Sequence, residues 1–408
     1  MRSPKSRSRP AAALAAAALA VATAAGCAAA GQAGTGSAAP AAATPVKVGM
    51  VTSQTGPLSE YAKEYLAGFN AGLGYVTGGT GKIDGHPVQV ITEDDQGSAT
   101  TAVNDAKDLI GKGATILAGP VDSGIALQVA AVAAQNKVLF ISGAAATGEL
   151  DNLNRYTFRS GRESYQDVAT AGTFLTSAAG KHVLVLAQDT AFGQANVAAV
   201  QAVLGGQGAA VSSTLVPTSA TDFTPFASKI LAAKPDLVFV AWAGATATAL
   251  WTTLDQQGVI GSTQVVTGLA NRATYPVFGA AGSKIEFLAH YFPGAGGGNP
   301  VEQAMTTAVD KAGGTVDLFT SDGFTAAQLL ARALGGSATD VNAQIKALEG
   351  WSFQGVLGRY TVRAADHALL QPEFQARLTG TGTTWTAQLV KTVDPQAIAP
   401  PVPAKPAW

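Results

Sequence analysis

From Val46 to Thr267 the sequence alternates between short apolar runs and longer amphipathic segments, and this alternation restricts the possible folds more than any other feature. Runs such as 46–51, 115–118 and 138–141 have the length and composition of buried strands. Segments such as 60–76 and 124–135 carry apolar residues at helical spacing. Strands that alternate with helices in this way predict βαβ units and an α/β fold with a parallel, doubly wound sheet.

The alternation pauses at 155–166 and restarts with a helix over 167–179, so the chain predicts two doubly wound units. A Gly/Pro-rich crossing is expected over 287–299, and late strands over 355–362 and 373–378. The 408 residues are enough for two lobes with a core in each. Two such units predict a two-lobed clamshell, in which ligands bind between the lobes at the carboxyl ends of the strands.

Composition argues against several classes of function. Charged residues make up 13% of the chain and the net charge is -1, which indicates neither nucleic acid nor an acidic membrane surface as a partner. The four histidines show no metal-ligand spacing, and there is no Gly-x-Ser-x-Gly, P-loop or His-Glu-x-x-His motif. We therefore expect no cofactor, no metal and no enzymatic activity. An amidase or hydrolase remains a distant alternative, because Ser123 has no histidine close to it in sequence.

The first 27 residues have the pattern of a targeting segment. A basic start (Arg2, Lys5, Arg7, Arg9) precedes an apolar run over 11–25, which is shorter than the roughly 20 residues of a permanent membrane span. The run ends in Ala-Ala-Gly-Cys, and Cys27 is the only cysteine. We expect 1–27 to be a lipoprotein signal with a lipid on Cys27. A plain secretory signal is the alternative. Residues 28–45 are expected to form a flexible tether.

The stretch 114–124 predicts an anion-binding site. A short strand ends at Gly119-Pro120, and a helix starts at Asp122-Ser123. The first amides of that helix and the Ser123 hydroxyl could bind a carboxylate, although both side chains could equally act only as helix caps. The next strand ends in Ser142-Gly143-Ala144-Ala145-Ala146-Thr147, whose small side chains leave room for a ligand.

Five segments, in this order, resemble the solute-binding lipoproteins of branched-chain amino-acid-type ABC transporters, which have the type I periplasmic-binding fold. The segments are VKVGMVTSQTGPLSEYAKEYLAGFNAGL, IDGHPVQVITEDDQGSATTAVNDAKDLI, ILAGPVDSGIALQVAAVAAQNKVLFISGAAAT, TDFTPFASKILAAKPDLVFVAW and DGFTAAQLLARAL. The resemblance covers about 46–392. It implies three hinge crossings, near 160–164, 290–293 and 357–360, and closure of the lobes around a solute.

The resemblance also implies roles for individual residues. Ser123 matches the serine that holds the ligand carboxylate, and Ala144 the residue whose carbonyl accepts the ligand ammonium. The family's threonine falls on Ala146, so either the loop shifts and Thr147 takes its place or the hydroxyl is lost. Three further residues match positions in the wall of the family's pocket: Tyr61, Phe192 and Phe319. Core packing is a competing explanation for Tyr61 and Phe192, and the alignment of Phe319 is less certain. At the end of the strand over 237–242, Trp242 and Ala245 favour an apolar or aromatic ligand.

The second lobe departs from the family pattern. Where many amino-acid binders place a glutamate for the ligand ammonium, this chain has Gly268-Leu269-Ala270-Asn271-Arg272, without an acid. A buried unpaired ammonium costs several kcal/mol, so Leu269 and Arg272 indicate a different ligand, with Arg272 suited to an anion or simply exposed. Arg162, Glu163, Tyr165 and Gln166 lie beside the first crossing. Surface exposure would explain each of them, and we retain Tyr165 and Gln166 as candidates.

These observations predict lobe 1 over 46–162 plus 292–357, lobe 2 over 163–291 plus 358–393, and a Pro-rich tail over 394–408. The expected function is capture of a small carboxylate-bearing solute, an amino acid or an aromatic or aliphatic acid, for delivery to an ABC permease. The protein is expected to be a monomer, tethered outside the cytoplasm by Cys27. A ligand-sensing domain for a membrane receptor is the alternative, since the same fold would serve it.

Overall fold

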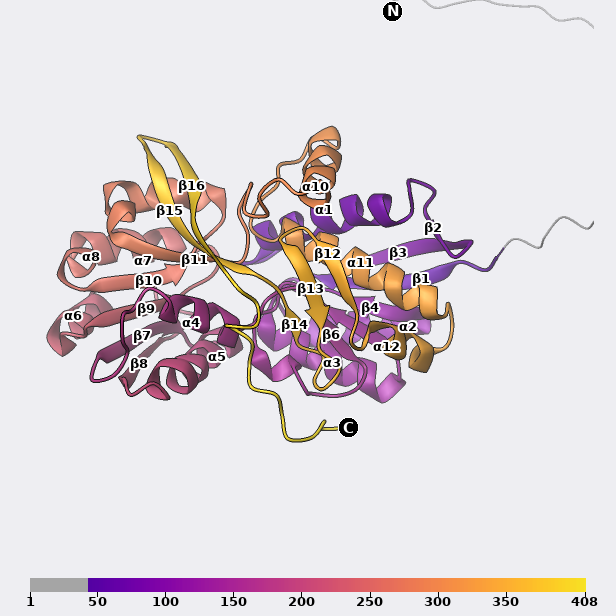
Figure 1. Ribbon diagram of the computed structural model, residues 1–408, viewed down its shortest axis with the longest axis horizontal. Helices are drawn as coiled ribbons and strands as arrows, with labels where there is room; N and C mark the ends of the chain where they lie inside the picture. Colours follow the sequence, from indigo (N-terminus) through magenta and orange to yellow (C-terminus); the bar gives the residue numbers. More distant parts are fainter. Residues whose placement is uncertain (1–42) are drawn as a thin grey trace, which may run out of the picture. The chain divides into compact units, whose positions relative to one another are not determined.

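A computed structural model describes residues 43–408, which form one compact unit. The predicted signal over 1–27, its Cys27 and all but the last residues of the tether lie outside the described residues. Two mainly parallel sheets, each covered by helices on both faces, form the two lobes of this unit (Figure 1). The predicted α/β fold with doubly wound parallel sheets is confirmed.

The first sheet has the strand order β2-β3-β1-β4-β5-β6, parallel except for the β2–β3 pair. Its strands are β1 (Val46–Thr52), β2 (Lys82–Ile83), β3 (His86–Asp94), β4 (Ala114–Ala118), β5 (Leu139–Ser142) and β6 (Thr157–Arg159). Helices α2 (Ala99–Gly111) and α3 (Ser123–Asn136) pack on one face through small and branched side chains. Helix α1 (Ser59–Val76) and helix α11 (Thr320–Gly336) cover the other face.

The second sheet has the order β16-β15-β11-β10-β9-β7-β8. Strands β11, β10, β9, β7 and β8 pair in parallel, whereas β15 pairs antiparallel with both β11 and β16. Its strands are β7 (His182–Gln188), β8 (Ala210–Val216), β9 (Leu237–Ala241), β10 (Gln264–Gly268), β11 (Ile285–Ala289), β15 (Glu373–Thr381) and β16 (Thr384–Val393). Strand β11 lies where we expected the start of an irregular crossing; its run Ile-Glu-Phe-Leu-Ala is short but mostly buried between β10 and β15.

Helices α4 (Ser164–Gly172) and α5 (Ala191–Val200) lie on one face of the second sheet. The other face is covered chiefly by α6 (Thr224–Ala233), α7 (Ala247–Gln256), α8 (Val259–Ser262) and α9 (Tyr275–Phe278). Helix α4 corresponds to the helix predicted over 167–179, but it starts three residues earlier and ends seven residues earlier than predicted. Its early start follows from Glu163, whose carboxylate accepts hydrogen bonds from the Tyr165 and Gln166 amides and caps the helix.

The third crossing lies later than the predicted 357–360. After α10 (Pro300–Lys311), α11 and α12 (Val341–Leu348), the chain forms a small antiparallel sheet of β12 (Ser352–Gly355), β13 (Gly358–Val362) and β14 (Leu369–Leu370). His367, in the turn before β14, stacks on Phe158 of the first lobe at 3.9 Å between ring centroids. Residues 358–370 thus stay with lobe 1, and the chain returns to lobe 2 at Gln371-Pro372.

The tail over 394–408 follows β16 of the second lobe and returns to the first lobe (Figure 1). The Arg363 guanidinium donates to the Pro400 carbonyl at 2.8 Å, the Ala407 amide donates to Asn152 at 2.8 Å, and Trp408 lies 4.6 Å from the His367 ring. Ile398 is buried. The tail is therefore a packed element that connects the two lobes once more.

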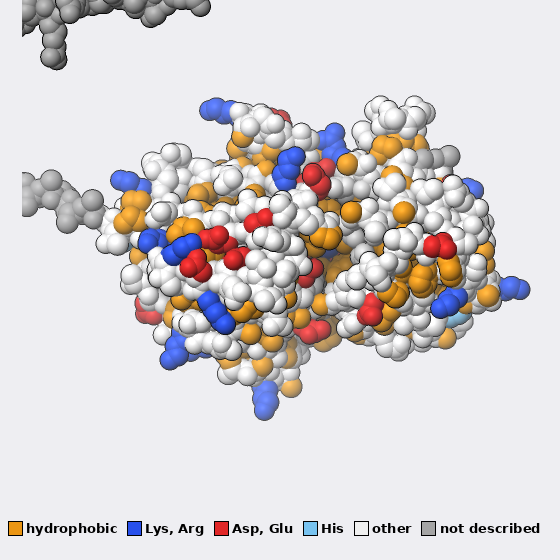
Figure 2. All heavy atoms as spheres, turned by 180° about the vertical axis from the view of Figure 1, so that it is seen from behind, with side chains coloured by type: hydrophobic (Ala, Val, Ile, Leu, Met, Phe, Trp, Pro, Cys, Tyr) orange, Lys and Arg blue, Asp and Glu red, His pale blue; other side chains and the backbone are white. Residues whose placement is uncertain are grey.

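On the face shown in Figure 2, acidic and basic side chains are mixed in small groups. Within residues 43–408, no helix has both the length and the apolar character needed to cross a bilayer.

Candidate ligand-binding site

A cavity of about 570 Å³ lies at the carboxyl ends of strands from both sheets. Lobe 1 supplies loop residues 56–58 after β1, the start of α3 after β4 and the loop after β5. Lobe 2 supplies the ends of β7, β9, β10 and β11. A volume within the roughly 300–1,000 Å³ of small-molecule sites, at the strand ends where α/β folds bind ligands, makes this the candidate site.

The β4–α3 turn brings Asp122 and Ser123 to the cavity wall. Gly119 has a φ of 78°, and a Cβ there would collide with the Val51 carbonyl of β1, so this turn requires glycine. The Asp122 carboxylate caps α3 by accepting from the Ile125 amide at 2.9 Å. The Ser123 hydroxyl accepts from the Thr147 amide at 3.2 Å, which leaves its own proton available to a ligand.

The loop after β5 is held by the first crossing. The Ser160 amide and hydroxyl donate to the Ser142 carbonyl, each at 3.0 Å, and the Ser164 amide and hydroxyl donate to that of Ala146 at 2.8 and 2.9 Å. An Arg162 Nη1 donates to the Ala144 carbonyl at 2.9 Å. Three carbonyls, those of Ser142, Ala144 and Ala146, therefore accept hydrogen bonds from the crossing that joins the lobes.

Of the two residues that the resemblance offered for the family's threonine, Ala146 lines the cavity, whereas Thr147 is fully buried and its hydroxyl accepts from the Glu149 amide at 3.3 Å. The Ala146 methyl group therefore forms part of this wall.

Apolar and aromatic side chains make up most of the remaining wall. Tyr61 and Phe319 lie 4.7 Å apart between ring centroids, and Phe319 lies 5.1 Å from His290. The opposite lobe contributes Phe192, Trp242, Ala245 and Leu269. Burial raises the pKa of Tyr61 to about 12, so its hydroxyl stays neutral. Such a wall suits the apolar or aromatic body of a ligand.

Besides Thr147, three predicted residues lie outside the cavity. Arg272 is exposed, outside the cavity, and its amide donates to Asp317 at 3.0 Å. Gln166 is fully buried; its Nε2 donates to the Leu369 carbonyl, and its Oε1 accepts from the Glu163 amide. Tyr165 packs against the core of lobe 2. Each of these residues lies outside the cavity because the segment that carries it packs against another part of the chain. The spacing of apolar residues along the sequence does not reveal such contacts.

Three ionisable side chains beyond the retained candidates line the cavity: Arg162, Asp167 and His290. Arg162 is 7% exposed, and its Nε lies 3.3 Å from the Asp167 carboxylate. Burial, partly offset by Arg162, raises the pKa of Asp167. Burial and the nearby Arg162 charge hold the pKa of His290 well below its usual range, so its ring is neutral. The sequence signal that could have identified Arg162 as a site residue is its position in the predicted first crossing, among small residues.

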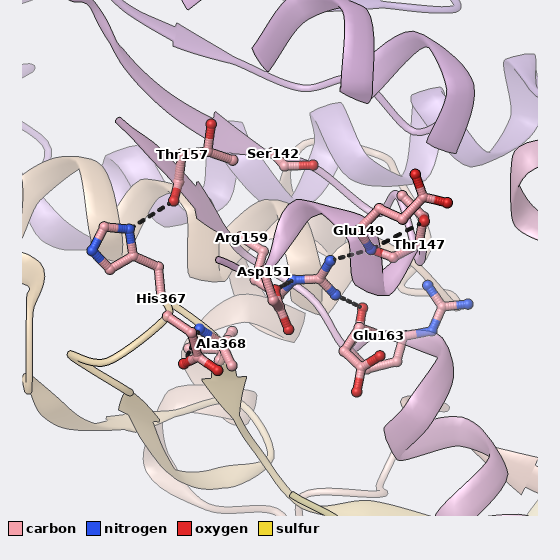
Figure 3. A network of polar contacts seen from close by, with 12 residues as sticks. Ser142, Thr147, Glu149, Asp151, Thr157, Arg159, Glu163, His367 and Ala368 are labelled. Atoms are coloured by element: carbon pink, nitrogen blue, oxygen red, sulfur yellow. Dashed lines mark hydrogen bonds and ion pairs between the residues drawn. The ribbon is translucent and has the colours of Figure 1, made fainter. Parts of the chain in front are cut away.

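A second buried arginine positions this arrangement (Figure 3). The Arg159 Nη1 donates to the Arg162 carbonyl at 2.9 Å and Nη2 to the Thr147 carbonyl at 2.6 Å, while Nε pairs with Asp151 at 2.7 Å. Arg159 therefore ties the cavity loop to the backbone that carries Arg162. Among residues 43–408, no group of three or more His, Cys, Asp or Glu side chains could hold a metal ion.

The comparisons with known proteins agree with this fold. A family model described as periplasmic binding protein matches residues 45–383. A solved ABC-type branched-chain amino acid transporter from Rhodopseudomonas palustris is 30% identical, with a TM-score of 0.71, and the match covers 88% of this chain and 99% of that one. A solute-binding protein of an ABC transporter from R. palustris, solved with 4-hydroxybenzoate, is 18% identical, with a TM-score of 0.77 over 86% and 97% of the two chains.

A curated relative, the Leu/Ile/Val-binding protein BraC3 of Rhizobium johnstonii, is 27% identical over 198 residues. That alignment covers 48% of this chain and 53% of the relative, so the match spans about half of the relative's length.

Proposed function

Because this chain belongs to the periplasmic binding protein family, we propose that it is the extracytoplasmic solute-binding component of an ABC importer. This is the family that the five sequence segments indicated. The proposed role is to capture a small carboxylate-bearing solute between the lobes and present it to a permease, with hinge closure stabilised by the ligand. The proposal rests above all on the 570 Å³ cavity, whose wall combines the Ser123 hydroxyl and the Arg162 guanidinium with apolar rings.

A carboxylate has two donors available at one side of this cavity. Ser123 begins α3, where free amides and the helix dipole favour negative charge. Arg162 contributes a buried guanidinium that can donate to an anion. The family is one of binding proteins, and we propose that the site releases its ligand unchanged.

A thermal-shift screen tests the proposal. We expect a carboxylic acid from a panel of amino acids, keto acids and benzoates to raise the melting temperature of the purified protein. A ligand at a thousandfold excess over its dissociation constant adds about 4 kcal/mol of stability. Ser123→Ala should weaken binding of the same ligand, because it removes a donor from the wall, whereas Ser337→Ala, outside the cavity, should leave it unchanged. Turnover of the ligand, or no response to any carboxylate, would refute the proposal.

We also propose that a lipid on Cys27 tethers the protein and that it acts as a monomer. Both follow from the sequence pattern and from the delivery role. Cys27→Ala should move the protein from the membrane fraction to the soluble fraction, and light scattering should give the mass of one chain. Retention of the Cys27→Ala protein in the membrane fraction would contradict the lipid anchor.

A further inference from the structure

Two loops of lobe 2 are hydrogen-bonded to side chains of lobe 1. The Asp317 carboxylate, in the segment between α10 and α11, accepts from the Arg272 amide at 3.0 Å. The Tyr61 hydroxyl on α1 accepts from the Gly244 amide at 3.4 Å. Gly244 lies in the loop after β9 and Arg272 in the loop after β10, so each of these loops is bonded directly to the opposite lobe.

The two lobe 1 acceptors belong to one packed group. Phe319, two residues after Asp317, lies 4.7 Å from Tyr61 between ring centroids, and its amide donates to Glu64 on α1 at 3.1 Å. On the side of lobe 2, β9 and β10 are neighbouring parallel strands. Because each lobe holds its half of the contact together, a movement of one lobe against the other acts on both hydrogen bonds at once.

The loop after β9 also fits closely against lobe 1. Gly244 has a φ of 81°, and a Cβ there would lie 3.1 Å from the Pro57 carbonyl and 3.3 Å from the Leu58 side chain. Pro57, Leu58 and Tyr61 all line the cavity. The bond between Tyr61 and Gly244 is therefore part of the contact that closes the cavity between the lobes.

The contact around Asp317 includes a second carboxyl group, that of Glu64. Burial, and next the Asp317 charge, raise the pKa of Glu64 to about 8, while hydrogen bonds with the Phe319 amide and the Asn271 side chain oppose this rise. Glu64 is therefore protonated near pH 7, which spares the contact a second negative charge. Asn271 precedes Arg272 in the loop of lobe 2, so its bond to Glu64 is one more link between the lobes.

We propose that Asp317 and Tyr61 form a latch: their hydrogen bonds to the Arg272 and Gly244 amides stabilise the closed arrangement of the two lobes over the cavity. Contacts that exist only in one state of a hinged protein shift the population toward that state. The latch consists of protein groups alone. A slower departure of the ligand would follow from it, and that consequence rests on the proposed function, whereas the latch itself does not.

Amide hydrogen exchange, followed by NMR on the purified protein without added ligand, tests the latch. Asp317→Ala removes the acceptor of the Arg272 amide but leaves the Tyr61 hydroxyl in place. We still expect exchange at the Gly244 amide to become about tenfold faster, because opening of the lobes releases both amides together.

Tyr61→Phe gives the reciprocal test, since it keeps the ring and removes only the hydroxyl. Exchange at the Arg272 amide should become roughly two- to fivefold faster, because a neutral hydrogen bond contributes less than one to a carboxylate. This variant also decides the matter if Asp317→Ala fails to fold.

Small-angle X-ray scattering separates opening of the lobes from a local change in lobe 1. Opening should give both variants a larger radius of gyration than the wild type. The matched controls are Asp310→Ala on α10 and Tyr75→Phe on α1, both at exposed positions, which should change neither the radius nor the exchange rates.

Two results would overturn the latch. One is faster exchange only at the amide that lost its acceptor. The other is an unchanged radius of gyration, which would assign the faster exchange to a local rearrangement. Neither measurement needs a ligand, so the latch can fail while the carrier function stands, and the thermal-shift screen can fail while the latch stands.

Discussion

At the scale of single residues, the most consequential side chain outside the cavity wall is Arg159. It is 2% exposed, pairs with Asp151 and donates to the carbonyls of Thr147 and Arg162. One side chain therefore joins β6, the cavity loop and the first crossing. Removing one partner from a buried ion pair leaves the other charge uncompensated, which usually costs more than the pair itself contributes.

We expect Arg159→Met to lower the free energy of unfolding by about 3–5 kcal/mol, measured by urea denaturation. The reason is that Asp151 and two carbonyls lose their donors in the interior. Arg155→Met is the matched control, because Arg155 is exposed and four residues away. Similar losses in both variants would show that the buried network contributes little.

At the scale of elements, α1 and α11 approach so closely that their backbones touch. A Cβ at Gly68 of α1 would collide with the Thr320 carbonyl, and one at Gly323 of α11 would collide with that of Tyr65. This close contact holds Phe319, just before α11, next to Tyr61 in the cavity wall. Glycine spacing along the two helices is thus a requirement of the site as well as of the core.

Gly68→Ala should destabilise the protein by roughly 1–3 kcal/mol or more, because the helices must separate to admit a methyl group. Gly74→Ala, on the same helix, has nothing within 4 Å of the added carbon. It should stabilise by about 0.5–1 kcal/mol through helix propensity. Urea denaturation of both variants measures the difference, and the same sign for both would contradict close packing as the cause.

The C-terminal segment is a second element whose contribution can be measured. Deleting residues 399–408 removes the hydrogen bonds to Arg363 and from Ala407 to Asn152, together with the Trp408 contact with His367. At about 1 kcal/mol per hydrogen bond, we expect a loss of roughly 2 kcal/mol in urea unfolding. Lys405→Ala, at an exposed position in the same segment, should have no effect. An unchanged deletion variant would mean that the tail does not hold the lobes.

At the scale of the whole molecule, buried carboxyl groups make stability depend on pH. Burial raises the pKa of Glu163 to about 8, and that of Asp322 to about 7. A carboxyl whose pKa is raised in the folded state binds more protons there than in the unfolded chain. The free energy of unfolding must then fall as pH rises toward the folded pKa.

We expect stability to decrease between pH 7 and pH 8 chiefly through Glu163, at a slope below the limit of about 1.4 kcal/mol per pH unit, because Asp322 is already above its folded pKa of about 7 in this window. Between pH 7 and pH 8 the histidines of the unfolded chain are largely deprotonated. Their titration therefore adds little to the pH dependence of stability in the opposite direction. Glu163→Gln should flatten the dependence, and Glu149→Gln, at an exposed position nearby, should leave it as in the wild type. Urea midpoints at several pH values measure this slope, and a rise from pH 7 to 8 would contradict it.

Much of the architecture was predictable from local patterns. The helix predicted over 124–135 matches α3, and the β4–α3 turn falls where Gly119-Pro120 and Asp122-Ser123 indicated it. Ser123, Ala144, Trp242 and Ala245 line the cavity because each follows the carboxyl end of a parallel strand, which is where α/β folds bind ligands, and the ends from both sheets meet at the cavity. These predictions needed only the period of apolar residues and the chemistry of turns.

Long-range packing decided the rest. Thr147 lies outside the cavity wall, and Arg162 lines it, because the first crossing bonds along the loop after β5. Arg272 lies outside the cavity too, where its amide donates to Asp317. The third crossing falls at 371–372 because β13 pairs with β12 and His367 stacks on Phe158. The sequence by itself determined the alternation of strands and helices and the edge at which a ligand would lie. Only the tertiary structure determined which charged side chain lines the cavity, because the direction of a side chain in a loop depends on partners far away in the chain.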